Sequence, residues 1–346
     1  MDHVLSRWPL SVPFRGLLCC LTVLALAACG ASAPTAVPTT PPDAVTLQLH
    51  WVHDYSSVGF YAAEKNGAFA SQNLTVTIAG GGFSEQGTYI DATTQVANGN
   101  ADFGIASADS IIQARAQGKP VVGIAAIFQR SPLAIISLEG SGINRPQDLP
   151  GHTIAVADGG ATQLYNTLLS LHTIDPVSAP PTPRTNAGIT PLINGNVDAM
   201  VAWAINEGVE LREAGKTPNI MLMSDFGIDS YELVLLTSEK MIAEHPDVVK
   251  RFLQATLQGW NDVLKNPDPA VALVQDYNAT LDLAGQQRRL QATLPLLTVP
   301  GTPFGAMQPE FWTFTHQMLL DQKALTQPIA LERAYTLTFL NDLATP

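Results

Sequence analysis

The sequence predicts an α/β fold arranged as two lobes of related build, and three observations lead to this prediction. Short strand-like runs alternate with helical runs, which is typical of a mostly parallel sheet covered by helices. The alternation begins again after residue 128, as a second sheet requires. Val96–Ala106 (VANGNADFGIA) and Leu192–Ala202 (LINGNVDAMVA) share an apolar helix end, Asn-Gly-Asn, Asp and a buried strand. The alternative is that any helix-to-strand connection has this look.

Four strands and three helices are predicted in the first lobe. Its first strand (VTLQLHW) alternates in the way that a half-buried strand does. Gly67 suits the end of the first helix, and three glycines at 80–82 follow the second strand. Glu85 favours a helix start, because negative charge is stabilised there. In chain order we expect strand Val45–Trp51, helix Ser56–Asn66, strand Leu74–Ile78, helix Ser84–Asn98, strand Asp102–Ala106, helix Ser110–Gln117 and strand Val121–Phe128.

The second lobe is predicted to repeat the alternation, interrupted by a proline-rich loop at 176–183, and a mainly helical region follows. Its expected strands are Leu133–Leu138, Thr153–Ala157, Ala199–Ala202 and Ile220–Ser224, and its helices are Thr162–His172, 187–194 and Asn206–Ala214. After a further strand at Leu233–Thr237, helices are expected at 239–265, 270–279, 283–293, 308–321 and 331–343.

The N-terminal segment indicates export. Arg7 and Arg15 accompany an apolar run, Gly16–Ala28, that is shorter than the roughly 20 residues of a membrane-spanning helix and is typical of a secretory signal. The sequence LAAC around Cys29 resembles the lipobox of bacterial lipoproteins, in which the cysteine receives a lipid before cleavage. The alternative is a plain secretory signal with an incidental cysteine. We therefore expect a signal peptide at 1–28 and a lipidated Cys29 with a Pro-rich tether at 29–43.

Composition excludes several functions. The net charge of −12 argues against nucleic-acid binding, which needs a basic surface. The three cysteines, Cys19, Cys20 and Cys29, lie in the N-terminal segment, so the body has no thiol for a disulfide, a thiolate metal site or a nucleophile. The histidines show no metal-ligand spacing with one another or with carboxylates. The sequence therefore predicts neither a metal nor a cofactor.

These features together resemble the two-lobed (type II-like) periplasmic binding proteins. More closely, the chain is similar to the family that includes thiamine-pyrimidine-precursor, alkanesulfonate and riboflavin binding lipoproteins. The resemblance covers most of the body. It is carried by LQLHWVHDYSSVGFYAAEKNGAFASQNLTVTI (47–78), VANGNADFGIASADSIIQARAQGKPVVGIAAIFQRSPLAIISL (96–138), INRPQDLPGHTIAV (143–156) and SEKMIAEHPDVVKRFLQATLQGW (238–260).

The resemblance implies two α/β lobes joined by two crossings, near Gln129–Pro132 and Ile228–Tyr231, with a ligand in the cleft between the lobes. The implied protein is the substrate-binding lipoprotein of an ABC importer rather than an enzyme. Its partners would be the permease and ATPase subunits, and a lipid would anchor it to the outer face of the cell membrane. The corresponding divisions are 44–131 for the first part of lobe 1, 132–230 for lobe 2, and 231–346 for the return to lobe 1 and the C-terminal helices.

Candidate ligand-binding residues follow the strand ends, because side chains and backbone groups there face a cleft. In the first lobe they are Trp51, Asp54, Tyr55, Ser107 and Asp109. An aromatic ligand would stack on Trp51 or Tyr55. The alternatives are that Trp51 belongs to the core and that Asp54 and Asp109 cap helices.

In the second lobe, the strand-to-helix turn at 158–162 offers backbone N–H groups to an anion or a carbonyl. Trp203 follows the strand after the second Asn-Gly-Asn turn, as Ser107 follows the strand after the first. Trp203 should therefore face the cleft together with Asn206. The second-lobe candidates are Asp158, Thr162, Trp203, Glu207 and, near the second crossing, Tyr231.

Riboflavin is the expected ligand. Residues 107–132 look most like members associated with riboflavin uptake, and aromatic residues from the two lobes would stack on its flat ring. A thiamine pyrimidine precursor, another small heterocycle or a sulfonate remains the alternative.

The alternative class is a pyrimidine synthase of thiamine biosynthesis. These enzymes have Asn-His shortly before Gly-Phe-Tyr, and a cysteine-rich motif. Here Gly59-Phe60-Tyr61 is present, but Ser56 and Ser57 stand where Asn and His would be, and no cysteine follows Cys29. Both departures favour binding over synthesis.

Overall fold

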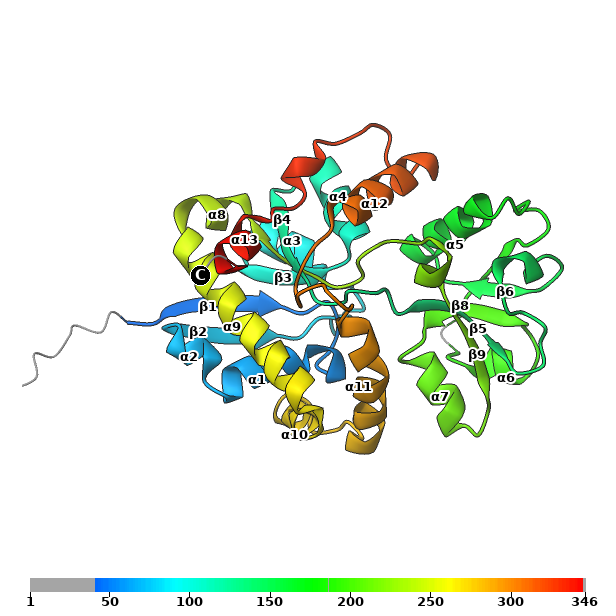
Figure 1. Cartoon of the computed structure of the whole chain (residues 1–346), viewed down its shortest axis with the longest axis horizontal. Helices are drawn as coiled ribbons and strands as arrows, with labels where there is room; N and C mark the ends of the chain where they lie inside the picture. The colour runs from blue at the N-terminus through cyan, green and yellow to red at the C-terminus, as the bar shows by residue number, and fades with distance from the viewer. Residues whose placement is uncertain (1–40, 186, 345–346) are drawn as a thin grey trace, which may run out of the picture. The chain divides into compact units, whose positions relative to one another are not determined.

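The computed structural model of the chain describes residues 41–185 and 187–344 (Figure 1). The expected signal peptide, Cys29 and the tether up to residue 40 lie outside the described residues. The chain forms two five-stranded sheets, each covered by helices. Two helix-covered sheets are what the sequence predicts, although β7 (Pro181–Pro183) of the second sheet lies where a loop was expected.

The first sheet contains β1 (Asp43–Gln48), β2 (Leu74–Ala79), β3 (Phe103–Ala106), β4 (Val121–Ala126) and β10 (Val234–Ser238) in the order β2-β1-β3-β10-β4. β1 runs parallel to β2 and β3, whereas β10 runs antiparallel to β3 and β4. The antiparallel strand is therefore the one that enters the sheet late in the sequence, after the second sheet is complete.

The second sheet repeats this arrangement. It contains β5 (Leu133–Leu138), β6 (Ile154–Val156), β7 (Pro181–Pro183), β8 (Ala199–Trp203) and β9 (Pro218–Leu222) in the order β7-β6-β8-β5-β9. β6 runs parallel to β7 and β8, and β5 runs antiparallel to β8 and β9. Strands β3 and β8, which follow the two Asn-Gly-Asn turns, hold the same place in the two sheets, so the two-lobed prediction is confirmed.

The shared Asp of the two turns has one structural role. Asp102 accepts a hydrogen bond from the Thr46 amide in β1 (2.8 Å), and Asp198 accepts one from the Thr153 amide that precedes β6 (2.8 Å). In each turn the glycine has a positive φ, 75° at Gly99 and 70° at Gly195, which ends the helix at little steric cost. The repeated segment therefore has the same structural role in each lobe: its Asp side chain binds the helix-to-strand turn to the neighbouring strand.

Helices cover both sheets (Figure 1). In the first lobe, Gly59 and Gly259 allow two helices to cross closely, because a Cβ at Gly59 would lie 2.1 Å from the buried Trp260 ring. The first-lobe helices are α1 (Val58–Lys65), α2 (Ala68–Ser71), α3 (Ala92–Ala97), α4 (Ala108–Ala116), α8 (Glu239–Glu244), α9 (Pro246–Lys265), α10 (Pro267–Ala272), α11 (Leu283–Leu297), α12 (Pro309–Asp321) and α13 (Thr338–Ala344). Those of the second lobe are α5 (Gly160–Leu171), α6 (Thr190–Ile193) and α7 (Glu207–Glu213).

Two crossings join the sheets, between β4 and β5 and between β9 and β10. The second crossing begins with the short 3-10 helix η3 (Met223–Phe226). A hydrogen bond from the Ser131 hydroxyl to Glu232 Oε1 (3.3 Å) links the two crossings to each other.

Several predicted elements were wrong. The helix expected at 84–98 begins only at Ala92, because Asp91 caps it by accepting from the Thr93 amide (3.0 Å), and the preceding residues form a loop closed by a bridge between Phe83 and Tyr89. The helix expected at 239–265 is broken at Pro246, which has no N–H to continue α8. The one expected at 331–343 is a 3-10 turn, η5 (Leu331–Arg333), followed by α13. The loop at 176–183 ends in β7.

Candidate functional site

A cavity of about 240 Å³ lies where β1 of the first sheet and β8 of the second end. Both lobes contribute to its wall. The lining residues are His50, Trp51, Asp54, Tyr55 and Ser56 from the first lobe and Arg184, Trp203, Asn206 and Glu207 from the second. Five of the expected ligand-binding residues therefore line one cavity: Trp51, Asp54, Tyr55, Trp203 and Glu207.

The aromatic part of the wall spans both lobes. The His50 ring stacks on Trp203 with centroids 6.2 Å apart and planes 19° apart, and Phe128 meets Trp203 edge-on at 6.0 Å. Trp51 is 40% exposed and contacts Phe83 edge-on at 5.9 Å. One face of Trp203 is thus occupied by a protein ring, whereas Trp51 presents open aromatic surface.

His50 lies two residues after the end of β1 and was not among the predicted site residues. Burial lowers the pKa of His50 to about 4, so its ring is neutral at physiological pH. Its Nδ1 is buried and has no hydrogen-bond partner within the described part of the chain. A buried nitrogen without a partner is costly unless a ligand or a water supplies one. The sequence analysis missed His50 because it falls inside the run Val45–Trp51 that was predicted as a strand, whereas β1 ends at Gln48.

Asp54 acts as the helix cap that the sequence left as its alternative role. Its Oδ1 accepts from the Ser56 amide (2.8 Å) and from the Ser56 hydroxyl (2.6 Å). Burial is the largest influence on the Asp54 carboxyl and raises its pKa, although the hydrogen bonds from Ser56 oppose that rise. The carboxylate lines the cavity while Ser56, also unpredicted, holds it in place.

Tyr55 is buried rather than open for stacking, and it joins the two lobes. Its hydroxyl donates to Asn206 Oδ1 (2.6 Å), and its amide donates to Gln286 Oε1 (2.8 Å). The expectation that the Tyr55 ring offers a stacking face does not fit this placement, because the ring is only 2% exposed.

The second lobe contributes an ion pair to the wall. Arg184, which follows β7, pairs with Glu207 at the start of α7 and also donates to the Val201 carbonyl (3.2 Å). The second oxygen of Glu207 accepts from the Trp203 amide (3.1 Å). Both carboxylate oxygens of Glu207 are therefore engaged by the protein.

A second cluster of polar side chains lies outside the cavity lining, at the edge of the first sheet where β3 ends and β10 begins. It contains Ser107 and Asp109 after β3 and Glu232 just before β10. Burial and the Asp109 charge raise the pKa of Glu232 to about 8, and burial also raises the pKa of Asp109. A Cβ built on Gly160, at the start of α5 in the second lobe, would lie 3.0 Å from Asp109 Oδ2. Asp109 thus faces the N-terminus of α5 across the cleft.

The structure does not bring the other candidates to the cavity. Asp158 is exposed, and Thr162 donates its hydroxyl to the Ala157 carbonyl (2.8 Å) within its own turn. Tyr231 is 1% exposed and lies in the core, where its hydroxyl accepts from the Gln308 amide (2.8 Å) and its ring packs on Phe311. These residues follow strand ends or a crossing, but none of the three side chains lines the cavity.

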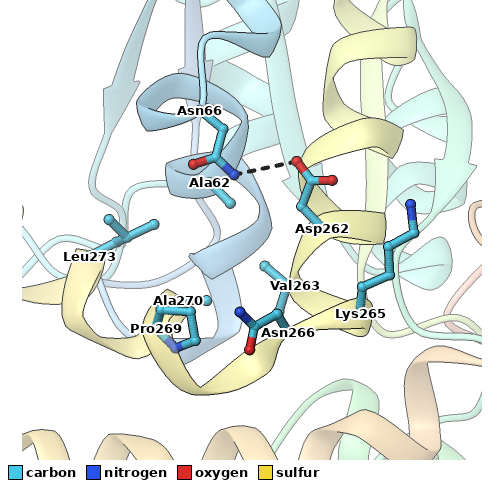
Figure 2. A pocket seen from close by; sticks show the side chains of 9 residues that line it. All are labelled: Ala62, Asn66, Asp262, Val263, Lys265, Asn266, Pro269, Ala270 and Leu273. Carbon is cyan, nitrogen blue, oxygen red and sulfur yellow. Dashed lines mark hydrogen bonds between the residues drawn. The ribbon is translucent and has the colours of Figure 1, made fainter.

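A larger hollow, about 430 Å³, lies among α1, α9 and α10 (Figure 2). Its polar groups include Asn66 and Asp262, which hydrogen-bond to each other (3.3 Å). Helices alone line it, and no strand end reaches it, so the smaller cavity between the lobes is the better candidate site.

Residues 41–185 and 187–344 lack two other features. No helix there is long and apolar enough to cross a membrane. Within the same ranges, His, Cys, Asp and Glu side chains form no group of three or more that would hold a metal ion.

Residues 55–270 match the model of a protein family described as NMT1/THI5 like. The chain is 27% identical to the riboflavin-binding protein RibY of Chloroflexus aurantiacus, over 92% of this chain and 95% of that protein. It is 26% identical to a formylaminopyrimidine-binding protein of Halalkalibacterium halodurans, over 93% and 98% of the two chains.

An enzyme is also among the relatives. The 4-amino-5-hydroxymethyl-2-methylpyrimidine phosphate synthase of Legionella pneumophila is 26% identical over 73% of this chain and 80% of the enzyme. Among solved structures, the periplasmic aliphatic sulphonate binding protein SsuA of Escherichia coli superposes with a TM-score of 0.67 at 15% identity, covering 85% of this chain and 92% of that protein. This likeness concerns the fold, which is that of the periplasmic binding proteins.

Proposed function

Because the chain belongs to the NMT1/THI5-like family, we propose that it is the solute-binding protein of an ABC importer and that its ligand is riboflavin. The similarity to RibY and to the formylaminopyrimidine-binding protein along nearly the whole chain supports a binding role. The ligand would be captured between the lobes and handed to permease and ATPase subunits.

The observation that carries this proposal is the cavity walled by aromatic rings from both lobes. Trp51 has open aromatic surface, and Trp203 is held by His50 and Phe128. Among residues 41–185 and 187–344, the buried His50 Nδ1 has no hydrogen-bond partner, so a ligand can supply one. A flat, uncharged ring system gains mainly from stacking and apolar burial, and a few hydrogen bonds then set its orientation. Riboflavin has this chemistry in its ring, with N–H and carbonyl groups at one edge.

A thiamine pyrimidine precursor is the second candidate. At about 240 Å³ the cavity lies below the roughly 300–1,000 Å³ of drug-sized ligand sites, so a single ring fits it without further opening. The similarity to the formylaminopyrimidine-binding protein supports the same ligand class. Riboflavin would require the lobes to part or its ring to extend over Trp51 at the mouth.

Calorimetry with riboflavin and formylaminopyrimidine side by side distinguishes the two ligands. The riboflavin proposal expects saturable one-to-one binding of riboflavin and much weaker binding of the pyrimidine. The reverse order of affinities would replace the ligand while leaving the binding role intact. Saturable binding of neither compound would contradict both candidates.

We also propose that the protein binds its ligand without converting it. Ser56 and Ser57 occupy the positions at which the synthases have Asn and His, and both are buried. The sequence has no cysteine after Cys29 for a cysteine-rich motif. Incubation with the pyrimidine precursor, followed by mass spectrometry, should return it unchanged, and turnover above a buffer blank would refute this proposal.

Finally, we propose that the mature protein begins at a lipidated Cys29 and lies on the outer face of the cell membrane. The apolar run ending in LAAC and the proline-rich residues after it support this placement. Labelling with a radioactive fatty acid should mark the wild type and not Cys29→Ser. Equal labelling of both would rule out this anchor.

A further inference from the structure

Two features of the second lobe would ordinarily attract an anionic ligand to the cleft. One is the guanidinium of Arg184, which lines the cavity. The other is the N-terminus of α5, a helix of 12 residues whose first amide groups and dipole favour negative charge. Each feature faces a carboxylate of the protein itself.

Arg184 is neutralised by Glu207. The two side chains form an ion pair, and both are largely shielded, with 20% and 17% of their side-chain surface exposed. The other oxygen of Glu207 accepts from the Trp203 amide, which fixes the carboxylate beside the guanidinium. An anionic ligand would have to displace a fixed carboxylate to reach Arg184.

The start of α5 faces Asp109 from the opposite lobe. Asp109 Oδ2 is 3.0 Å from the point where a Cβ on Gly160 would lie, so the carboxylate occupies space beside the first residue of the helix. Gln113 holds it from within the first lobe, donating from Nε2 (3.4 Å). The absence of a side chain at Gly160 is what leaves room for this approach.

Glu232 interacts electrostatically with Asp109 at this place. Burial and the charge of Asp109 raise the pKa of Glu232 to about 8, so Glu232 is mainly neutral at pH 7 and the Asp109 carboxylate is the charge that an entering ligand meets. An anion entering here meets an existing buried charge of the same sign. Like charges placed together in a shielded site are strongly unfavourable.

We propose that Asp109 and Glu207 form a charge filter, which makes the cleft selective for uncharged ligands over phosphorylated or sulfonated ones. This inference rests on the proposed function, in which the natural ligand of the protein is riboflavin rather than flavin mononucleotide. The filter acts because Glu207 already pairs with Arg184 and Asp109 already faces the N-terminus of α5, so neither feature is open to an anionic ligand.

The test compares riboflavin with flavin mononucleotide, which adds a phosphate to the same ring. Calorimetry gives the ratio of the two affinities for the wild type, Asp109→Asn and Glu207→Gln. The wild type should prefer riboflavin by at least about tenfold, and each variant should lower that preference several-fold, with the double variant lowering it most. Because the readout is a ratio, a general loss of affinity in a variant does not mimic the effect.

Glu139→Gln is the matched control. Glu139 is exposed and follows the end of β5 opposite to the cleft, since Leu133 pairs with Trp203 at the other end of that strand. The Glu139→Gln substitution removes one negative charge from the lobe that contains Glu207 but not from the cavity, so it should leave the preference as in the wild type. An equal change of the affinity ratio in Glu139→Gln would assign the effect to net charge and overturn the filter. An unchanged ratio in both Asp109→Asn and Glu207→Gln would also overturn it.

A second measurement separates this inference from the identity of the ligand. Methanesulfonate and inorganic phosphate are titrated into the wild type and the Asp109→Asn/Glu207→Gln double variant, with thermal melting to verify folding. Binding that is gained only by the double variant supports the filter even if riboflavin proves not to be the ligand. Anion binding by the wild type at comparable affinity would refute it.

Discussion

Trp51→Ala tests whether the open aromatic surface at the cavity is used by the ligand. Trp51 is 40% exposed and lines the cavity, and its edge contact with Phe83 holds it in place. Because much of its surface is open to solvent, its removal should lower binding more than stability.

The magnitude follows from the exposed area. A tryptophan side chain lies at the upper end of the roughly 150–250 Å² of aromatic side chains, so 40% exposure corresponds to about 100 Å². At about 25 cal/mol per Å², covering all of it contributes about 2.5 kcal/mol and covering half contributes about 1.3 kcal/mol. Trp51→Ala should therefore weaken riboflavin binding by about 8- to 60-fold.

The assay is quenching of the flavin's own fluorescence, since the substitution removes a protein fluorophore. Val177→Ala is the control, because Val177 is 84% exposed in the second lobe and does not line the cavity. Trp51→Phe should retain part of the affinity through its smaller ring. If Trp51→Ala binds as tightly as the wild type, the ligand does not cover Trp51 and the pocket lies elsewhere.

Three further predictions concern the interlobe hydrogen bond, the buried acid and the close helix crossing. Tyr55→Phe removes the hydroxyl that donates to Asn206, and we expect calorimetry to show a ligand affinity lower by about 2- to 10-fold. An unchanged affinity would mean that this hydrogen bond does not stabilise the bound state. The pKa of Glu232 is raised from 4.5 to about 8 in the folded protein, so the wild type should lose stability relative to Glu232→Gln as the pH rises from 4.5 to 8. A melting-temperature difference between the two proteins that is equal at pH 5 and pH 8 would argue against a raised pKa. Gly59→Ala should lower the free energy of unfolding in urea by about 1–3 kcal/mol, because its Cβ would lie 2.1 Å from the buried Trp260 ring. A urea midpoint equal to that of the wild type would show that α1 and α9 move apart at little energetic cost.

Local patterns determined the lobes of this protein. The two Asn-Gly-Asn turns predict equivalent strands because glycine ends a helix and a buried apolar run continues as a strand, and β3 and β8 hold equivalent places. The helix expected at 84–98 failed for a reason that is also local. Asp91 starts α3 by capping it, and this cap competes with the earlier start that Glu85 suggested.

The sequence also indicated which strand ends reach the cleft, since carboxyl ends of parallel strands meet at one edge of a sheet. Trp51 and Trp203 line one cavity for that reason. It did not indicate which way each side chain turns after the strand ends. Tyr231 packs into the core, and Asp158 is exposed and does not line the cavity.

Only the tertiary structure decided the contacts across the cleft. The stacking of His50 on Trp203, the bond from Tyr55 to Asn206 and the approach of Asp109 to Gly160 each join residues from different lobes. Periodicity and capping act over a few neighbouring residues, so they carry no information about the distance between two sheets. That distance results from how the crossings and the packed helices set one lobe against the other, and it determines which polar groups remain free for a ligand.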